Sequence, residues 1–134
     1  YKKEEAVDVL LKQEMIAIFQ GHSEWGARAL GNRSILFDPR NKDAQKIVNK
    51  IKGRQWWRPT AATILYEHRN DYLEMHGLDE SPYMTYAIDL FYDKTGVPLL
   101  LNTSFNLKGY PIVETFNDAL WTLQNSQINY LYTP

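Results

Sequence analysis

The sequence predicts an α/β (α+β) domain built around a mixed sheet. Helix-like and strand-like segments alternate along the chain, which is typical of this class. The chain has 134 residues, of which 44% are apolar, and this is enough for one domain with a single core. Neither an internal repeat nor a low-complexity linker divides the sequence. We therefore expect one domain over residues 1–134.

The first half of the chain is predicted to contain two helices and three strands. Ala6, Val9 and Leu10 fall on one stripe of a helix, and Ile47 and Ile51 are one helical turn apart. The continuous apolar run MIAIF indicates a buried strand. The expected elements are a helix over 2–13, a strand over 15–19, a loop with glycines over 21–32, a strand over 35–37, a helix over 41–52 and a strand over 61–66.

The second half is predicted to continue this alternation. Gly96 is expected to stop a helix, and Thr115 and Asp118 have the spacing of a capping box that starts another. The apolar run VPLLLN indicates a central strand. The expected elements are a short helix over 70–76, a strand-like segment over 83–88, a helix end over 89–96, a strand over 97–102, a helix over 115–125 and a strand over 128–132.

The composition of the chain argues against several kinds of protein and of functional site. Cysteine is absent, which excludes disulfides and thiolate metal sites and is typical of a cytoplasmic protein. The three histidines are scattered, so the sequence does not favour a metal centre. No apolar run is long enough to span a bilayer, and the start YKKEEAVDVL does not resemble a signal peptide. A Walker P-loop, a G-x-G-x-x-G motif and a Ser-His-Asp set are also absent from the sequence.

The net charge of −1 conceals a basic segment. Residues 28–58 contain nine Lys or Arg and two acidic residues, so this segment carries +7 and the remainder carries −8. Such a local field suits a small anion or a nucleic acid. A solvated helix face explains Lys42, Lys46 and Lys50, which recur at helical spacing. It does not explain arginines that stand beside Gly, Trp and Pro.

The first of three stretches that suit an anion is EWGARALGNRSILFDPR. Arg28, Arg33 and Arg40 stand there among glycines and small residues without an obvious acidic partner. Ser34 follows Arg33 and could donate a hydrogen bond to the same ligand. We therefore expect this stretch to contact a negatively charged ligand.

The second stretch is IKGRQWWRP, which follows a predicted helix. Lys52 and Arg54 are two residues apart, so in an extended segment both side chains would point the same way. A lysine point charge and a planar arginine fork together suit a polyphosphate, and Arg58 lies close by in the sequence. A surface cluster with Trp56 and Trp57 in the core fits the spacing equally well.

The third stretch is LNTSFNLKGYP, in which a buried strand runs into polar residues. Asn102, Ser104 and Asn106 lie where a central strand ends, and open α/β sheets bind ligands at such places. Gly109 permits close approach of the backbone. Alternatively, the Ser and Asn side chains cap their own backbone in a turn.

These stretches, together with SPYMTYA and TGVPLLLNTSFNLKGYPIVETFNDAL, resemble the C-terminal domain of O-carbamoyltransferases of the nodulation-factor and cephem-antibiotic type. The resemblance covers nearly the whole chain. Residues 52–54 and 103–106, with Gly109 and Pro111, are also similar, more distantly, to motifs of the YrdC-like threonylcarbamoyl-adenylate synthases. The resemblance implies a YrdC-like twisted mixed sheet flanked by helices.

The resemblance also implies an activity. In the family, the YrdC-like domain binds ATP and carbamoyl phosphate and forms carbamoyl adenylate, with release of pyrophosphate. A separate N-terminal domain, which holds the metal, transfers the carbamoyl group to a hydroxyl acceptor. This chain is expected to be the activating half without that domain, with the N-terminal domain of the same polypeptide as its partner. ATP is expected as a substrate with Mg²⁺, without a metal site in this domain; membrane and nucleic acid are not expected partners, and homodimer formation is left open.

The resemblance implies roles for the residues of this chain that match the motifs of the family. Lys52, Arg54 and Arg58 are the catalytic candidates, because they would hold the triphosphate or carbamoyl phosphate. Glu24 would orient an arginine, and Trp25 would line the pocket or pack in the core. The candidates for substrate binding are Arg28, Arg33, Ser34, Asn102, Ser104 and Asn106.

Some positions depart from the family pattern without loss of a matched cation. They are Ala27, Thr60, Ala62 and Tyr110, the last of which replaces a usual acidic residue. The family also has a further segment where Ala87 is followed directly by Ile88 here. Either the protein lacks this segment or a loop is missing from the sequence as written. We favour the second explanation, because a direct junction would leave little room for a turn.

Two other functions fit the sequence. The basic segment, with Trp56 and Trp57, could bind RNA in a YrdC-like module. The departures from the pattern also fit an inactive domain that only docks onto the N-terminal half.

Overall fold

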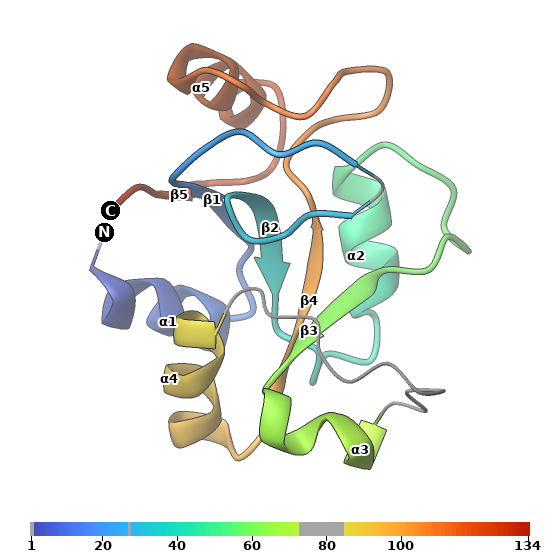
Figure 1. Ribbon diagram of the computed structural model, residues 1–134. Coiled ribbons are helices and arrows are strands. Elements are labelled where there is room, and N and C mark those ends of the chain that lie inside the picture. Colours follow the sequence, from blue (N-terminus) through green and yellow to red (C-terminus); the bar gives the residue numbers. More distant parts are fainter. Residues whose placement is uncertain (1, 27, 73–84) are drawn as a thin grey trace.

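The sheet of the protein has five strands, and the computed structural model in Figure 1 describes residues 2–26, 28–72 and 85–134. The predicted α/β class with a mixed sheet and flanking helices is confirmed. In chain order the described elements are α1 (Lys3–Leu11), β1 (Ile16–Phe19), β2 (Arg33–Phe37), α2 (Ala44–Ile51), β3 (Ala61–Ile64), the 3-10 helix η1 (Tyr66–His68), α3 (Arg69–Tyr72), α4 (Thr85–Thr95), β4 (Leu99–Ser104), α5 (Phe116–Gln124) and β5 (Tyr130–Tyr132).

The strands follow the order β3-β4-β2-β1-β5, so β4 lies inside the sheet as predicted. β1 and β5 are parallel, and the other neighbouring pairs are antiparallel. In the β2–β4 pair, Ser34 lies opposite Ser104. This register joins two of the polar stretches at one end of the sheet.

Alternation along the strands divides the core between two layers of helices. On one face, Ile16 and Ile18 of β1 pack with α1 and α4. On the other face, Ala17 of the same strand packs in a cluster with α2 and α5. Each face of the sheet is therefore covered by helices (Figure 1). The start of β2 and the end of β4, which carry polar residues, lie side by side at one end of the sheet.

The strand-like prediction over 83–88 is wrong for the part that the structure describes, because α4 begins at Thr85. Residues 83 and 84, like the end of the predicted 70–76 helix, lie outside the described residues. Ala87 and Ile88 are successive residues within α4, so their direct junction needs no turn. The helix ends before Gly96, as predicted, and the φ of Gly96 is +70°.

Among the described residues, none of the helices has the length and apolar character needed to cross a membrane.

Candidate anion-binding site

A pocket of about 300 Å³ lies between the C-terminal end of α2 and the loop that follows β4. The residues that line it come from the second and third stretches singled out in the sequence. They are Lys52, Arg54, Gln55, Arg58, Ser104, Asn106, Leu107, Lys108 and Gly109. Four of these side chains are cationic and none of this lining is acidic, so the pocket is suited to an anion.

Lys52 lies at the base of this pocket and is only 5% exposed. Its ammonium donates to Ser104 Oγ at 3.1 Å, to Asn106 Oδ1 at 2.8 Å and to the backbone carbonyl of Ser104. Burial, followed by the positive charge of Arg54, lowers the pKa of Lys52 to about 7. The amine is therefore only partly protonated near pH 7 when the pocket holds no anion.

Arg54 reaches the same pocket, although the segment is not extended as the sequence predicted. Lys52 caps α2 in a helical conformation, and Gly53 has a φ of +64°, which turns the chain so that Arg54 follows on the same side. Arg54 Nε donates to Asn49 Oδ1 at 2.5 Å, and Nη2 donates to Thr60 Oγ1 at 3.2 Å. Burial and then the charge of Arg58 lower the pKa of Arg54.

Arg58 lines the pocket, and side chains of α2 hold its backbone in place. Its carbonyl accepts from Asn49 Nδ2 at 2.8 Å and from Gln45 Nε2 at 2.9 Å. Asn49 also donates to the carbonyl of Trp56 at 2.9 Å. This buried asparagine therefore fixes the loop of both arginines, a role that the sequence analysis missed and that no local pattern signals.

The end of β4 supplies the polar wall of the pocket. Ser104 Oγ donates to Asn106 Oδ1 at 2.7 Å, and Asn106 Nδ2 donates to the carbonyl of Tyr110 at 2.8 Å. The amide nitrogen of Lys108 donates to the carbonyl of Lys52 at 3.1 Å, which joins this wall to α2. Lys108 was also missed, although its place two residues after Asn106 is a signal that could have found it.

Arg33 is predicted to bind substrate, and the structure places it outside the lining of this pocket, with its guanidinium bonded to backbone carbonyls. Nε donates to the carbonyl of Val113 at 3.1 Å, and Nη1 donates to the carbonyls of Gln20 at 2.7 Å and Asn32 at 2.9 Å. Its Cζ lies 3.8 Å from the centroid of the Phe19 ring. Arg33 thus ties together loops at the end of the sheet, and burial lowers its pKa.

Three other candidates also lie outside the pocket lining. Ser34 is buried, and its Oγ accepts from the backbone nitrogen of Gly31 at 3.1 Å. Asn102 Nδ2 donates to the carbonyl of Ala29 at 3.2 Å and to Thr63 Oγ1 at 2.8 Å. Arg28 is exposed in the loop between β1 and β2. Ser34 and Asn102 therefore hold that loop on the sheet.

Glu24 orders the same loop by binding its backbone. Its carboxylate accepts the amide hydrogens of Leu30, at 2.8 Å, and of Asn32, at 2.5 Å. Its negative charge also raises the pKa of Arg33 against the lowering effect of burial. The neighbouring Trp25 is almost fully exposed and lies outside both the core and the pocket lining.

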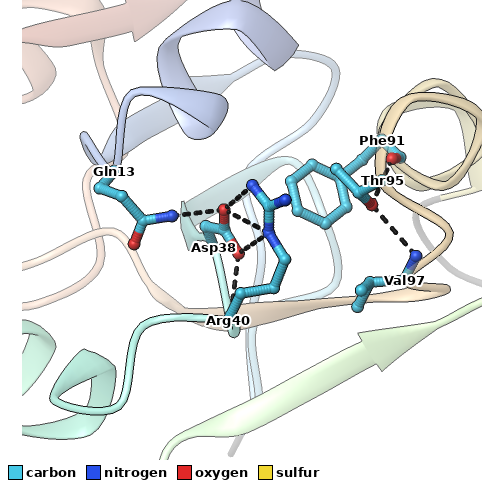
Figure 2. Close-up of polar contacts among 6 residues, drawn as sticks. All are labelled: Gln13, Asp38, Arg40, Phe91, Thr95 and Val97. Carbon is cyan, nitrogen blue, oxygen red and sulfur yellow. Dashed lines mark hydrogen bonds and ion pairs between the residues drawn. The ribbon is translucent and has the colours of Figure 1, made fainter.

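Arg40, which had no obvious partner in the sequence, is paired with the buried Asp38 (Figure 2). Its Nη2 lies 2.6 Å from Asp38 Oδ2, and Gln13 Nε2 donates to the same oxygen at 2.5 Å. The guanidinium also lies over the Phe91 ring, with Cζ 5.4 Å from the centroid. The hydrogen bonds from Arg40 to Asp38 raise the pKa of the arginine. This arginine is therefore structural.

A larger pocket of about 460 Å³ lies between α2 and the turns after α1 and α5. The described residues that line it include no Lys or Arg, and Glu14 adds a negative charge. An anion would therefore prefer the smaller pocket, which we take as the candidate site. In the described part of the chain, no group of three or more His, Asp or Glu side chains is arranged to hold a metal ion.

Comparison with known proteins identifies the family. The family described as "Carbamoyltransferase C-terminus" matches residues 7–90 and 86–134, which together cover most of the chain. The chain belongs to this family. The family matches in two segments that overlap at residues 86–90, and the junction of Ala87 and Ile88 lies within this overlap.

Individual relatives agree with this assignment. The chain is 33% identical to nodulation protein NolNO of Sinorhizobium fredii, with 86% of this chain and 23% of the relative covered. It is 30% identical to nodulation protein NolO of Bradyrhizobium diazoefficiens, with 92% and 30% covered. An uncharacterized protein of Methanocaldococcus jannaschii is 32% identical, with 84% and 29% covered.

The chain thus spans less than a third of the length of these relatives. The comparison with NolNO runs over 154 aligned positions, which exceeds the 134 residues of the chain. NolNO therefore has residues within the aligned region that this chain does not have.

Proposed function

We propose that this chain is the activating domain of an O-carbamoyltransferase and that it binds ATP and carbamoyl phosphate to form carbamoyl adenylate. The observation that carries the proposal is the pocket with four cationic side chains, two polar side chains at a strand end and no acidic lining residue. Both substrates bear several negative charges, so each suits such a pocket. Membership of the carbamoyltransferase family supports the choice of substrate.

The proposed reaction needs no nucleophilic side chain. Hydrolysis of carbamoyl phosphate leaves carbamate and phosphate. A carbamate oxygen then bonds to the α-phosphorus of ATP, while the bond from that phosphorus to the leaving pyrophosphate breaks. In this proposal Lys52, Arg54 and Arg58 position the phosphates and offset their charge, and Mg²⁺ accompanies ATP. Ser104 and Asn106 bind phosphate or carbamate oxygens. An N-terminal domain of the whole protein transfers the carbamoyl group to a hydroxyl acceptor.

Calorimetric titration tests the proposal with ATP and with carbamoyl phosphate. We expect saturable binding of both to the wild-type chain and at least about tenfold weaker binding to Arg54→Ala, because charge-assisted hydrogen bonds are lost. Arg69→Ala is the matched control, since this arginine lies in α3, beyond the other end of β3, and contacts Tyr66. Equal affinities of the two variants, or no binding of either ligand to a folded chain, would contradict the proposal.

A second candidate is RNA binding through the exposed Trp56 and Trp57, which are 71% and 59% exposed and lie between Gln55 and Arg58 of the pocket lining. These side chains are not in the core, contrary to the alternative considered for this stretch. Exposed aromatic rings bordered by cations can stack on single-stranded bases. Binding of an RNA oligonucleotide with a steep dependence on salt, together with no binding of ATP, would favour this function.

A further inference from the structure

The turn that closes the candidate pocket ends in an aromatic residue, Tyr110. Gly109 lines the pocket, and Tyr110 is the next residue. The carbonyl of Tyr110 accepts from Asn106 Nδ2 at 2.8 Å, and its amide nitrogen donates to the carbonyl of Leu107 at 3.1 Å. Asn106 in turn accepts from Lys52 at the base of the pocket. The backbone of Tyr110 is thus fixed to the wall that holds the anion-binding groups.

The ring of Tyr110 is held in place and yet remains open to a ligand. Its centroid lies 4.8 Å from that of Trp121 on α5, with an angle of 49° between the rings. Tyr110 is 54% exposed and Trp121 is 41% exposed. A capping box of Thr115 and Asp118 anchors the start of α5. The two rings therefore form a positioned aromatic surface, which we call the Tyr110–Trp121 pair.

Tyr110 directly follows Gly109 of a pocket lining that is rich in cations, and the combination suits a ligand with a charged end and a flat end. Phosphates would occupy the pocket among Lys52, Arg54 and Arg58, while a planar ring stacks on the tyrosine. Single exposed aromatic residues are common on protein surfaces. Here the fixed backbone, the ring contact and the adjoining cations occur together.

We infer that the Tyr110–Trp121 pair binds the base of a nucleotide whose phosphates lie in the cationic pocket. The inference rests on the proposed function, and it assigns the nucleotide preference to a position where this chain departs from the pattern of its family. Trp56 and Trp57 are also exposed near the pocket, but the described ring contacts do not involve either of them. The tyrosine is therefore the better positioned ring.

The test compares ATP with inorganic tripolyphosphate, which has the charged end without the base. We expect the wild-type chain to bind ATP about 5- to 100-fold more tightly than tripolyphosphate, as base stacking on an aromatic ring predicts. Tyr110→Ala should remove this preference and leave the affinity for tripolyphosphate unchanged, whereas Tyr110→Phe should keep the preference. Tyr72→Ala is the control, since Tyr72 is similarly exposed but lies in α3.

Four results would overturn the inference. Equal affinity of the wild-type chain for the two ligands would exclude a base-binding surface. If Tyr110→Ala weakened the binding of ATP and of tripolyphosphate equally, the base would bind elsewhere. The same would follow if only Trp57→Ala lost the preference for ATP over tripolyphosphate. Failure of both ligands to bind would instead refute the proposed function, and this inference with it.

Discussion

Lys52 is a buried cation whose immediate partners are neutral oxygen atoms. Three acceptors from Ser104 and Asn106 bind its ammonium, and the nearest charge that shifts its pKa is the positive charge of Arg54. Burial of the charged form is therefore costly until an anion arrives. The stability of the protein without ligand should reveal this cost.

Replacement of Lys52 by methionine should change how stability depends on pH. Below about pH 7 both the folded and the unfolded chain hold the proton, so the full cost of burial is present. Between this value and the usual lysine pKa near 10.5, only the unfolded chain holds it, so the wild type gains stability as pH rises. We expect the free energy of unfolding of the wild type, minus that of Lys52→Met, to rise by about 2 kcal/mol from pH 7 to 9.

Urea unfolding at several pH values measures this difference. Lys50→Met is the control, because Lys50 is exposed on the same helix. Parallel pH profiles of the wild type and Lys52→Met would show that Lys52 keeps an ordinary pKa in the folded protein.

Of the cations that the sequence proposed for ligand binding, Lys52, Arg54 and Arg58 line the pocket, whereas Arg28 and Arg33 lie outside its lining. Lys52 and Arg54 stand two residues apart in the chain, so their closeness could be inferred from spacing, although the turn at Gly53 replaces the extended segment that was assumed. The carbonyl partners of Arg33 belong to Val113 and Glu114 as well as to nearby residues, and such long-range backbone contacts leave no local pattern. Whether an arginine binds ligand or backbone therefore depends on the tertiary structure.

At the level of elements, Asp38 connects three parts of the fold (Figure 2). It lies directly after β2, accepts from Gln13 in the turn after α1, and holds Arg40 over Phe91 of α4. The two carboxylate oxygens are buried, so loss of the carboxylate would leave several donors without this acceptor.

We expect Asp38→Ala to lower the free energy of unfolding by about 2–4 kcal/mol, because hydrogen bonds to a buried charge are lost. Asp43→Ala is the matched control. Asp43 pairs with Lys46 on the surface, so its loss should cost much less than the loss of Asp38. Chemical denaturation of both variants measures the two costs, and similar values would show that the buried pair contributes no more than the exposed one.

Elements with a clear period or cap were predicted correctly, and the failure at 83–88 has a physical reason. β4 and α5 agree with their predictions to within two residues, and the expected capping box at Thr115 is present. The segment before Asp89 has many aromatic and apolar residues, which favour a strand locally. A helix forms there instead of a strand because Ile88 and Phe91, three residues apart on one helical face, are both buried in the cluster with α1.

Over the whole molecule, positive charge is concentrated in the part of the chain that forms the candidate site. The segment over 28–58, which carries +7, supplies three of the four cations of the pocket, and Lys108 supplies the fourth. The sequence predicted the fold class, the polar end of β4 and three of the four cations that line the pocket, but not Lys108. The closure of the pocket between α2 and the turn after β4 required the structure, because residues 52 and 108 meet only through the topology of the sheet.

Binding of ATP should weaken as salt rises, because part of the attraction is between exposed charges and is screened. We expect the affinity of the wild type to fall several-fold between about 0.05 and 0.5 M NaCl. Arg54→Ala should show a shallower dependence, since one contributing charge is absent. Titrations at four salt concentrations measure both slopes, and an affinity independent of salt would argue against a charge-based site.

The hydrogen bond from the Lys108 amide to the Lys52 carbonyl joins the two walls of the pocket. An amide proton held in this way exchanges with deuterium only when the bond opens. The exchange rate of this single amide therefore measures how often the walls separate, and it can be followed by NMR before any ligand is known. A ligand that bridges the walls should slow the exchange, whereas one that binds elsewhere should leave it unchanged.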